Sequence, residues 1–277
     1  MNLYIKPTTV QEALNALAEN SLLVLAGGTD YYPSRVGRPL DDDILDISHI
    51  QGLRGISEKE DYFRIGALTR WSDLIEKDLP SYFDGLKLSA MEVGGKQIQN
   101  IGTITGNICN ASPAADGIPP LLCLNAEVEL KSLRGKHSMP LAKFLMGNRK
   151  TRRAIDEIVT GLRIPKLKYP ADATFLKLGS RKYLVISIAM VSVIIEKHNG
   201  TIASARIAVG SCSAVAKRLH LLERTLLGQL ILPGISKQIT AQHLNQLSPI
   251  DDVRGTAEYR KDVALILIRR ALEQLVS

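Results

Sequence analysis

A short glycine-containing stretch near the amino terminus has the residue types of a phosphate-binding turn. In Val24-Leu-Ala-Gly-Gly-Thr-Asp-Tyr31, an apolar run stops at two glycines, a hydroxyl and a carboxylate. The glycines permit positive φ and close approach of a ligand to the backbone, and Thr29 and Asp30 can hold the turn or bind a ligand hydroxyl. The stretch matches neither the Gly-x-Gly-x-x-Gly nor the P-loop pattern, so an ordinary structural turn is the competing interpretation.

A second segment, residues 94–116, combines glycine and asparagine with apolar residues. Its sequence, GGKQIQNIGTITGNICNASPAAD, holds four glycines, three asparagines, three hydroxyls and one carboxylate within 23 residues. The apolar residues between them argue against a disordered loop. A buried polar segment must satisfy its amides and carbonyls, and a bound polar ligand can supply the missing partners. The alternative is a tight core crossing held by asparagine side chains, but so much glycine and asparagine exceeds what turns alone require.

The other candidates carry weaker chemistry. The five histidines are scattered, which predicts neither a metal site nor a Ser–His catalytic pair. The run Asp41-Asp42-Asp43 is interpreted as a solvated loop rather than a magnesium site. Lys177, set between apolar neighbours in FLKLGS, could reach a ligand phosphate or carbonyl, and an exposed strand lysine is the alternative. We therefore expect a binding protein for a polar ligand, with no catalytic side chain of its own.

The elements that would position the first glycine stretch form a small parallel unit. Thr9-Val-Gln-Glu12 has capping-box spacing and begins a helix with an apolar face. Residues 22–25 form a short buried strand that ends at the glycines, and residues 44–47 form a second such strand. Strands joined through a helix predict parallel pairing.

The chain beyond this unit has an α+β texture. The segments DYFRIGALT and AEVELKSLRG alternate polar and apolar residues, as strands with one wet face do, and helices are expected to start near Thr69 and Ser81. A domain boundary is expected near RIPKLKYPAD. Strands follow at TFLKLG, ISIAMVSVIIEK and TIASARIAVGS, with His198-Asn-Gly200 as a hairpin turn. The last helix, TAEYRKDVALILIRRALEQL, has apolar residues at helical spacing, namely Tyr259, Val263, Ile266 and Leu267.

Size and composition limit the classes of protein. A length of 277 residues favours about two domains. The three cysteines form no Cys-x-x-Cys pair, which favours a reducing, cytoplasmic compartment, and the longest apolar stretch, residues 186–195, is too short to span a bilayer. The net charge of +7 admits a nucleic-acid surface, but only 5% of residues are aromatic and no recognition motif is present. Solvated faces or a partner-docking surface are the favoured interpretation of the basic clusters.

Read together, the two glycine segments resemble a known family. AGGTD followed by KQIQNIGTITGNICNASPAAD is similar to the FAD-binding medium subunits of the molybdenum hydroxylases, the xanthine dehydrogenase and carbon monoxide dehydrogenase family. RIGALTRWSDL, EIVTGLRIP, FLKLGSRK and RGTAEYRKDVALILIRRAL occur in the family's order, so the resemblance covers nearly the whole chain. One departure is Thr105-Gly106-Asn107, where many relatives have Gly-Gly-Asn, so the backbone at Thr105 must accept a Cβ.

The resemblance implies an α+β fold with two domains. Residues 1–168 would form a two-lobed FAD-binding domain of the vanillyl-alcohol-oxidase (PCMH) type, with lobes of about 1–55 and 56–168. Residues 169–277 would form a carboxyl-terminal domain of antiparallel sheet and helices. By the same analogy, the residues implied to hold the pyrophosphate are Ala26, Gly27, Gly28, Thr29, Asp30 and Tyr31. Those implied to lie along the adenosine and ribityl side are Thr103, Gly106, Asn107, Asn110 and Asp116, with Val93 and Gly94 nearby. Ile158 and Val159 would pack on the flavin or adenine, and Lys177 would lie near the isoalloxazine end.

The resemblance further implies an oxidoreductase subunit that moves electrons through FAD. They would arrive from [2Fe-2S] clusters on a small partner subunit, while the molybdenum cofactor and substrate hydroxylation belong to a large partner subunit. The final acceptor would be NAD, oxygen or a quinone, and the assembly would be a dimer of heterotrimers. Two alternatives remain open: a self-contained FAD-dependent oxidase or reductase of the same fold, and a non-catalytic assembly subunit that has lost its flavin.

Overall fold

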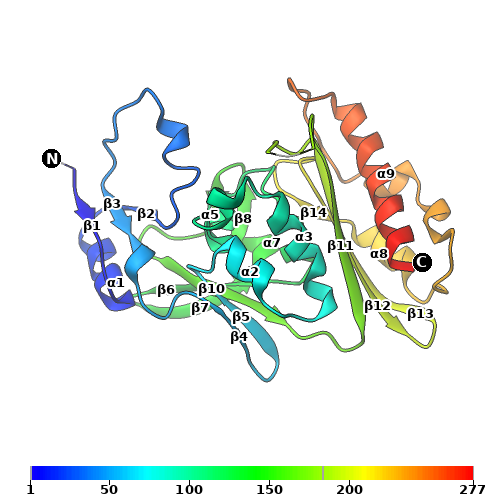
Figure 1. Cartoon of the computed structure of the whole chain (residues 1–277), viewed down its shortest axis with the longest axis horizontal. Helices are drawn as coiled ribbons and strands as arrows, with labels where there is room; N and C mark the ends of the chain where they lie inside the picture. The colour runs from blue at the N-terminus through cyan, green and yellow to red at the C-terminus, as the bar shows by residue number, and fades with distance from the viewer. Residues whose placement is uncertain (1, 183, 277) are drawn as a thin grey trace.

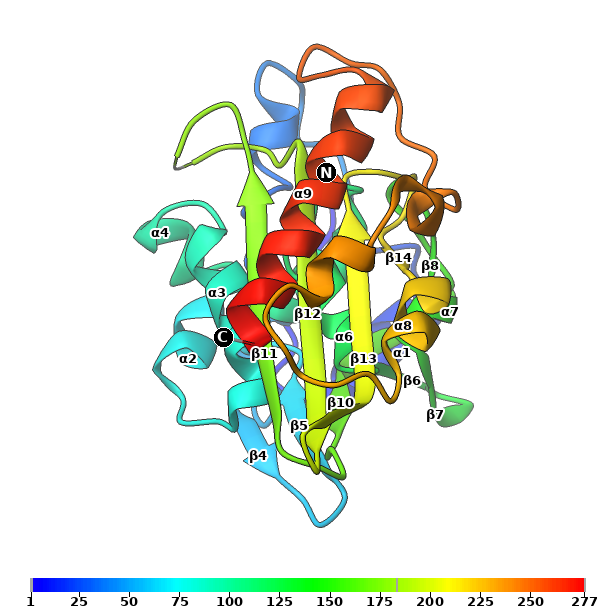
Figure 2. The same ribbon diagram turned by 90° about the vertical axis from the view of Figure 1, so that its right-hand side faces the viewer.

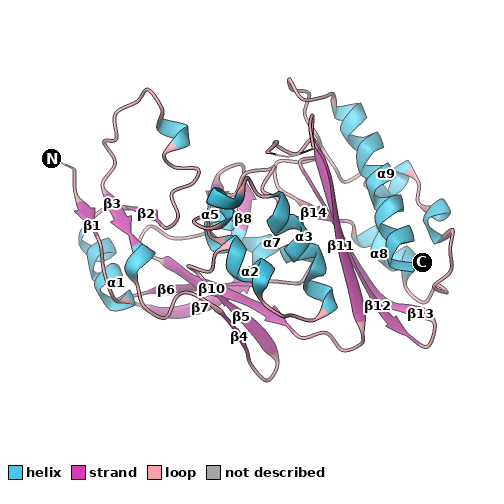
Figure 3. Ribbon diagram, in the orientation of Figure 1, coloured by secondary structure: helices cyan, strands magenta, loops and turns pink. Residues whose placement is uncertain are grey.

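In the described residues, three larger sheets follow one another along the chain, with a fourth, two-stranded sheet and helices beside them. The structure is a computed structural model that describes residues 2–182 and 184–276. Figure 1 shows the three-stranded sheet beside the N-terminus, a five-stranded sheet in the middle and a four-stranded sheet towards the C-terminus. Figure 3 shows short helices between the five-stranded and four-stranded sheets, and Figure 2 shows two further helices on the outer face of the latter.

The first sheet is the small parallel unit that the sequence predicts. Its spatial order is β1 (Tyr4–Ile5), β3 (Ile44–Asp46), β2 (Leu23–Leu25), and both pairings are parallel. The helix α1 (Val10–Glu19) joins β1 to β2 and buries Ala13, Leu14, Ala16 and Leu17. Thr9 caps it by accepting the N–H of Glu12 at 3.2 Å, but the Glu12 carboxylate accepts the N–H of Thr8 rather than of Thr9. The loop from β2 to β3 contains η1 (Pro33–Arg35), and η2 (Ile47–His49) follows β3.

The second sheet is wholly antiparallel. In β6 the side chains alternate between half-buried and buried, so the expected one-sided strand is confirmed there. The sheet contains, in spatial order, β4 (Ile56–Glu58), β5 (Tyr62–Gly66), β10 (Ile158–Pro165), β6 (Glu127–Ser132) and β7 (Gly135–Pro140). Its accompanying elements are α2 (Trp71–Glu76), η3 (Ser81–Phe83), α3 (Asp84–Glu92), α4 (Lys96–Gln99), α5 (Ile104–Asn110), α6 (Ile118–Cys123), α7 (Leu141–Phe144), β8 (Leu145–Gly147) and β9 (Lys150–Thr151).

The third sheet is antiparallel and is ordered β11-β12-β13-β14. The predicted hairpin between β12 and β13 is confirmed: Asn199 and Gly200 both have positive φ, 49° and 72°, as a two-residue turn between twisted strands requires. The strands are β11 (Ala171–Leu178), β12 (Ala189–His198), β13 (Thr201–Gly210) and β14 (Lys217–Arg218). The elements that follow are α8 (His220–Leu226), η4 (Ile235–Gln238), η5 (Ala241–Leu244) and α9 (Ala257–Val276).

The helix α9 packs through a narrower face than its apolar residues suggest. Val263 and Leu267 are buried as expected, but Tyr259 and Ile266 are 47% and 45% exposed, so their expected place in the core is wrong. The buried stripe runs instead through Arg260, Val263, Ala264, Leu267 and Ile268, and positions 259 and 266, two turns apart on one side of the helix, lie outside it. Within the described residues, no helix combines the length and apolarity needed to cross a membrane, and α9 is no exception.

Candidate functional site

The two glycine-rich segments lie against each other. We call the loop of residues 26–43 between β2 and β3 the first jaw, and residues 94–116 the second jaw. A Cβ added to Gly27 would overlap the backbone carbonyl of Ile101, and one added to Gly102 would lie 3.2 Å from the Thr29 hydroxyl. The absence of side chains at Gly27 and Gly102 is therefore what lets the jaws approach.

The first jaw presents a row of unpaired backbone donors. Gly28 has φ of +66°, in the left-handed region that favours glycine, and this turns the chain directly after β2. Within the described part of the chain, the N–H groups of residues 28–31 donate no hydrogen bond. Successive free amides in such a turn form a concave site for an anion. The expected phosphate-binding role of the stretch thus has a physical basis in its geometry.

Side chains of the first jaw hold the loop in shape. The Tyr31 hydroxyl donates to Asp42 Oδ2 at 2.8 Å, and Arg35 Nε donates to the same oxygen at 2.7 Å. Partial burial and the Asp42 hydrogen bond raise the pKa of Tyr31, whereas the Tyr31 hydroxyl and Arg35 hold the pKa of Asp42 below its ordinary value. Asp43 accepts the N–H of Leu3 at 2.7 Å. The acidic run is therefore used partly to fasten the loop, rather than being only solvated.

The second jaw is built into the protein core. The helix α5 is capped by Thr103, whose hydroxyl accepts the N–H of Gly106 at 2.9 Å, and Ile104 and Ile108 are fully buried. Thr105 stands in this helix with a buried side chain, so the Cβ that distinguishes it from many relatives is accommodated by ordinary helical backbone.

Two polar atoms on α5 are buried without a partner. Thr105 Oγ1 and Asn107 Oδ1 have no hydrogen bond to any described residue. A buried acceptor without a donor costs free energy, so a ligand bearing hydroxyls or amines would be favoured beside them. Together with the free amides of the first jaw, these atoms fit the ribose, ribityl, adenine and diphosphate groups of the dinucleotide that the resemblance implies.

Lys177 reaches the second jaw from β11. Its ammonium lies 2.8 Å from Asp116 Oδ2 and 3.4 Å from the Glu92 carbonyl oxygen, and its side chain is only 5% exposed, so the alternative of an exposed strand lysine is wrong. Ser187 donates to Asp116 Oδ1 at 2.6 Å. Burial raises the pKa of Asp116, against the opposing effect of Lys177. The resemblance implied different parts of the ligand for Asp116 and Lys177, but the structure brings the two side chains into direct contact.

A cavity of about 370 Å³ lies beside this ion pair. It is flanked by basic side chains, and an anionic or electron-rich group would be favoured there. The lining residues are Glu92, Lys177, Leu178, Gly179, Arg181, Lys182 and Val185.

The remaining expected residues differ in how they could meet a ligand. Val93 is half-buried, and Gly94 has φ of +56° beside Ile98. Ile158 and Val159 are 0% and 5% exposed and are packed in two hydrophobic cores, so a ligand contact there would come from the backbone rather than from the side chains.

Two polar residues near the jaws escaped the sequence analysis. Ser187 is bonded to Asp116, and Arg149 contacts both Asp30 and Asn110, at 3.0 and 3.2 Å. Neither belongs to a motif, and only the fold brings them near the glycine segments. Residues 149–153 form one of the basic clusters in the sequence, but the sequence does not indicate which residues this cluster contacts.

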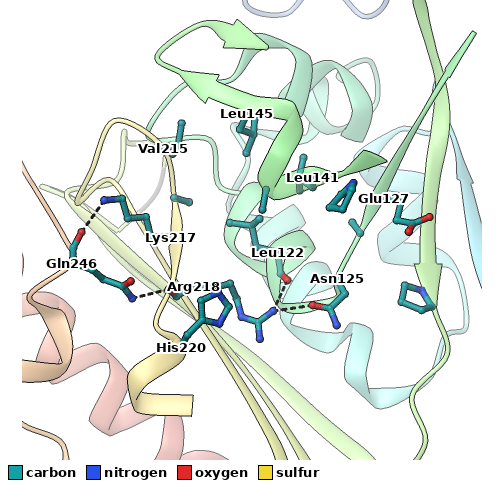
Figure 4. A pocket seen from close by; sticks show the side chains of 15 residues that line it. Leu122, Asn125, Glu127, Leu141, Leu145, Val215, Lys217, Arg218, His220 and Gln246 are labelled. Carbon is teal, nitrogen blue, oxygen red and sulfur yellow. Dashed lines mark hydrogen bonds between the residues drawn. The ribbon is translucent and has the colours of Figure 1, made fainter. Parts of the chain in front are cut away.

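A second cavity is lined by residues outside both jaws. Figure 4 shows this space, of about 610 Å³, between α6 and β14, with apolar walls that include Leu122 and Val215. Its polar groups are already paired: Arg218 donates to the Leu122 carbonyl and to Asn125, and Lys217 donates to the Gln246 carbonyl. Among the described residues, no group of three or more His, Cys, Asp or Glu side chains could hold a metal ion. The jaws are therefore the better candidate site, because their polar groups still need partners.

Comparison with known proteins identifies the same family that the glycine segments resemble. Residues 1–167 match the family described as "FAD binding domain in molybdopterin dehydrogenase", and residues 174–275 match the "CO dehydrogenase flavoprotein C-terminal domain". The chain is 30% identical over 275 residues to the glyceraldehyde dehydrogenase medium chain of Sulfolobus acidocaldarius, covering 98% of this chain and 97% of that one. It is 28% identical over 284 residues to the xanthine dehydrogenase FAD-binding subunit of Escherichia coli O157:H7, with coverages of 99% and 96%.

A solved structure extends the similarity to the whole fold. A chain of the carbon monoxide dehydrogenase of Hydrogenophaga pseudoflava superposes with a TM-score of 0.89 at 28% identity, covering 99% of this chain and 96% of that chain. The fold is thus shared along nearly the full length of both chains. This chain belongs to the family of FAD-binding medium subunits of the molybdenum hydroxylases, which includes the xanthine and carbon monoxide dehydrogenase subunits.

Proposed function

We propose that the chain holds FAD non-covalently between its two jaws and serves as the electron-transfer subunit of a molybdenum hydroxylase complex. One observation carries the proposal: four successive free amides, at residues 28–31, lie on a loop that contacts a second segment with two unpartnered buried oxygens. A dinucleotide carries both the anionic phosphates and the hydroxyl donors that such a pair of surfaces requires.

The same geometry supports an assignment of roles along the cofactor. Residues 26–31 hold the pyrophosphate through backbone amides. Thr103, Gly106, Asn107 and Asn110 serve the adenosine and ribityl side, with Val93 and Gly94 near them. Asp116 and Lys177 serve the end nearer the isoalloxazine, since the cavity of about 370 Å³ lies beside their ion pair. The cofactor-binding domain spans residues 1–168, and the carboxyl-terminal domain spans residues 169–277.

FAD, when bound, supplies the conversion between one-electron and two-electron carriers. The chain's own residues bind and orient it. The free amides face the diphosphate, the buried oxygens of α5 accept hydrogen bonds, and the buried Lys177–Asp116 pair keeps a cation fixed near the ring end. No side chain of the chain has to act as nucleophile or general base in this role.

The proposed partners are a small subunit with [2Fe-2S] clusters and a large subunit with the molybdenum cofactor. The assembly is a dimer of heterotrimers, and the acceptor is NAD, oxygen or a quinone. Cytoplasmic localisation is supported by three free cysteines, Cys109, Cys123 and Cys212. Burial raises the pKa of these thiols to about 11, 12 and 11, which disfavours their reaction.

Absorbance of the purified chain tests the proposal. We expect flavin bands from the protein, release of FAD into the supernatant on acid precipitation, and recovery of the bands when FAD is added back to the stripped chain. A chain that neither carries nor takes up FAD would be a non-catalytic assembly subunit. Reduction of the bound flavin by an organic substrate without partner subunits would identify a self-contained oxidase or reductase instead.

A further inference from the structure

One exposed arginine bridges the two jaws. Arg149 Nη1 lies 3.0 Å from Asp30 Oδ2 in the first jaw and 3.2 Å from Asn110 Oδ1 in the second. Arg149 comes from neither jaw but from the turn between β8 and β9. A guanidinium offers several fixed donors, so a single side chain can hold two acceptors on separate segments.

The backbone of Arg149 adopts a conformation that arginine does not favour. Its φ is +54°, in the left-handed region where glycine and asparagine are preferred. The turn is fastened to the second jaw, because the Arg149 N–H donates to the Ala111 carbonyl at 3.0 Å. This hydrogen bond fixes the turn from which the Arg149 side chain extends towards Asp30 and Asn110.

The bridge contributes little to the stability of the fold. The Arg149 and Asp30 side chains are 55% and 53% exposed, and ion pairs between exposed side chains are worth little in water. Its effect falls instead on the relative position of the jaws. The first jaw is a solvent-exposed loop, and Arg149 ties its Asp30 to the core-anchored second jaw.

We propose that Arg149 is a latch that keeps the first jaw closed over the diphosphate of the bound dinucleotide and so sets the rate at which the cofactor leaves. This inference rests on the proposed function, because it takes FAD as the ligand between the jaws. Arg149 is a positioning residue that acts through Asp30 and Asn110. Its cationic charge also offsets the Asp30 carboxylate, which would otherwise repel the phosphates of a ligand held by neighbouring amides.

The test uses the full chain and the variant Arg149→Gly. Glycine suits the left-handed backbone, so the thermal midpoint is expected to stay equal or rise, while FAD release after dilution becomes about fivefold to tenfold faster. Flavin fluorescence follows the release. Arg149→Lys keeps the charge without the planar fork and should give an intermediate rate. Lys150→Gln is the matched control, since it removes a charge from the same hairpin, and should release FAD at the wild-type rate.

A double-mutant cycle with Asp30→Asn tests whether the two side chains act together. The double variant Arg149→Gly/Asp30→Asn should release FAD no faster than the quicker of the two single variants. Rising salt should speed release from the wild type and leave Arg149→Gly nearly unchanged. Wild-type release from Arg149→Gly, fully multiplicative effects in the cycle, or an equal effect of Lys150→Gln would overturn the latch.

A cofactor-free readout separates the latch from FAD binding itself. The first jaw contains Arg35, which is followed by Val36, so trypsin cleavage after Arg35 can report how often this loop opens. In FAD-free chain, Arg149→Gly should be cut in the first jaw several-fold faster than wild type, and Lys150→Gln should not. If the wild-type chain binds no FAD but this difference appears, the proposed function fails and the bridge between the jaws stands. If FAD binds and the difference is absent, the latch fails.

Discussion

The two jaws face each other but are held in position by different interactions. The first jaw is held mainly by its own side chains, such as Tyr31 and Arg35 on Asp42, and carries exposed apolar residues such as Val36, which is 84% exposed. The second jaw buries Ile104 and Ile108 completely and is part of the core. The first jaw is free to open by local motion, whereas opening the second would require breaking the core.

This difference separates binding from release. The second jaw provides a fixed surface with oxygens that already lack partners, so its geometry exists before the ligand arrives. The first jaw contributes the free amides of residues 28–31, and its closure would keep the bound ligand in place. Substitutions in the second jaw, or where the first jaw touches it, should therefore act on stability and affinity together, and those elsewhere in the first jaw more on retention of the cofactor.

The largest effect is expected where the jaws touch. In Gly27→Ala, the new Cβ would overlap the Ile101 carbonyl. Because that carbonyl belongs to the backbone and cannot rotate away as a side chain would, the jaws must separate. We expect a loss of about 3 kcal/mol in the free energy of unfolding, together with loss of bound FAD. Denaturant unfolding and flavin absorbance measure these. Gly147→Ala is the control for adding a methyl, since nothing lies within 4 Å of its Cβ position and its backbone is not left-handed. Wild-type stability and flavin content in Gly27→Ala would contradict the close contact.

The first jaw should show loss of cofactor with a smaller loss of stability. In Gly28→Val, a branched side chain would meet the left-handed backbone and the Tyr32 ring, 2.7 Å from the new Cβ. The turn must change shape and its amides must turn away, so we expect purified protein without FAD and a loss of about 2 kcal/mol in the free energy of unfolding. Full flavin occupancy in Gly28→Val would count against the amide cradle.

The anchor of the second jaw to β11 is expected to respond to pH. In Lys177→Met, the buried Asp116 carboxylate loses its cation, and unfolding should become easier by about 3 kcal/mol near neutral pH. Asp116 has a pKa raised above its ordinary 3.8 mainly by burial, so the folded chain binds this proton more tightly than the unfolded chain does.

The sign of that linkage is testable with Asp116→Asn. The stabilisation from the Asp116 proton is fully present below pH 3.8 and is lost as pH rises through the raised pKa. The free energy of unfolding of wild type minus that of Asp116→Asn should therefore fall as pH rises from about 3.8. Chemical unfolding across pH measures it. If this difference in the free energy of unfolding stays constant or grows with pH, burial does not raise the pKa of Asp116.

The smallest effect on stability is expected at the orphaned hydroxyl of α5. Thr105→Val keeps the shape but removes a buried oxygen without a partner, so the FAD-free chain should gain up to about 1 kcal/mol in the free energy of unfolding. If Thr105 Oγ1 faces the cofactor, the same change should weaken FAD binding about fivefold. Thr105→Ser preserves the hydroxyl and is the control. A Thr105→Val variant that binds FAD as tightly as wild type would exclude Thr105 Oγ1 from the polar contacts with the cofactor.

The jaws and the cavity of Figure 4 differ in whether their polar groups already have partners, which is why cavity volume does not identify the candidate site. That cavity is larger, but Arg218, Lys217 and Gln246 are occupied with protein partners. The jaws, as far as the described residues show, present donors and acceptors that are still unpaired. Hydrogen-bonding capacity, rather than volume, marks the place where a polar ligand is needed.

Much of the fold could be predicted because local patterns and tertiary structure agree. The continuous apolar runs at β2 and β3, the alternation in β6 and the Asn199-Gly200 turn each have a short-range cause, and each appears in the structure. Of the apolar residues noted at helical spacing in α9, Val263 and Leu267 are buried, but Tyr259 and Ile266 are not. Periodicity shows which residues can share a face of a helix, but not how wide a strip of that face the sheet covers.

The sequence by itself determined which two glycine-rich segments are the candidate site for a polar ligand, since glycine and asparagine in an apolar context create backbone groups that need partners. Only the tertiary structure decided how the segments meet. It put Gly27 against Ile101, buried Lys177 on Asp116 and set Arg149 across Asp30 and Asn110. These contacts join residues far apart in the chain, and their formation depends on the packing of whole sheets and helices, which no local pattern encodes.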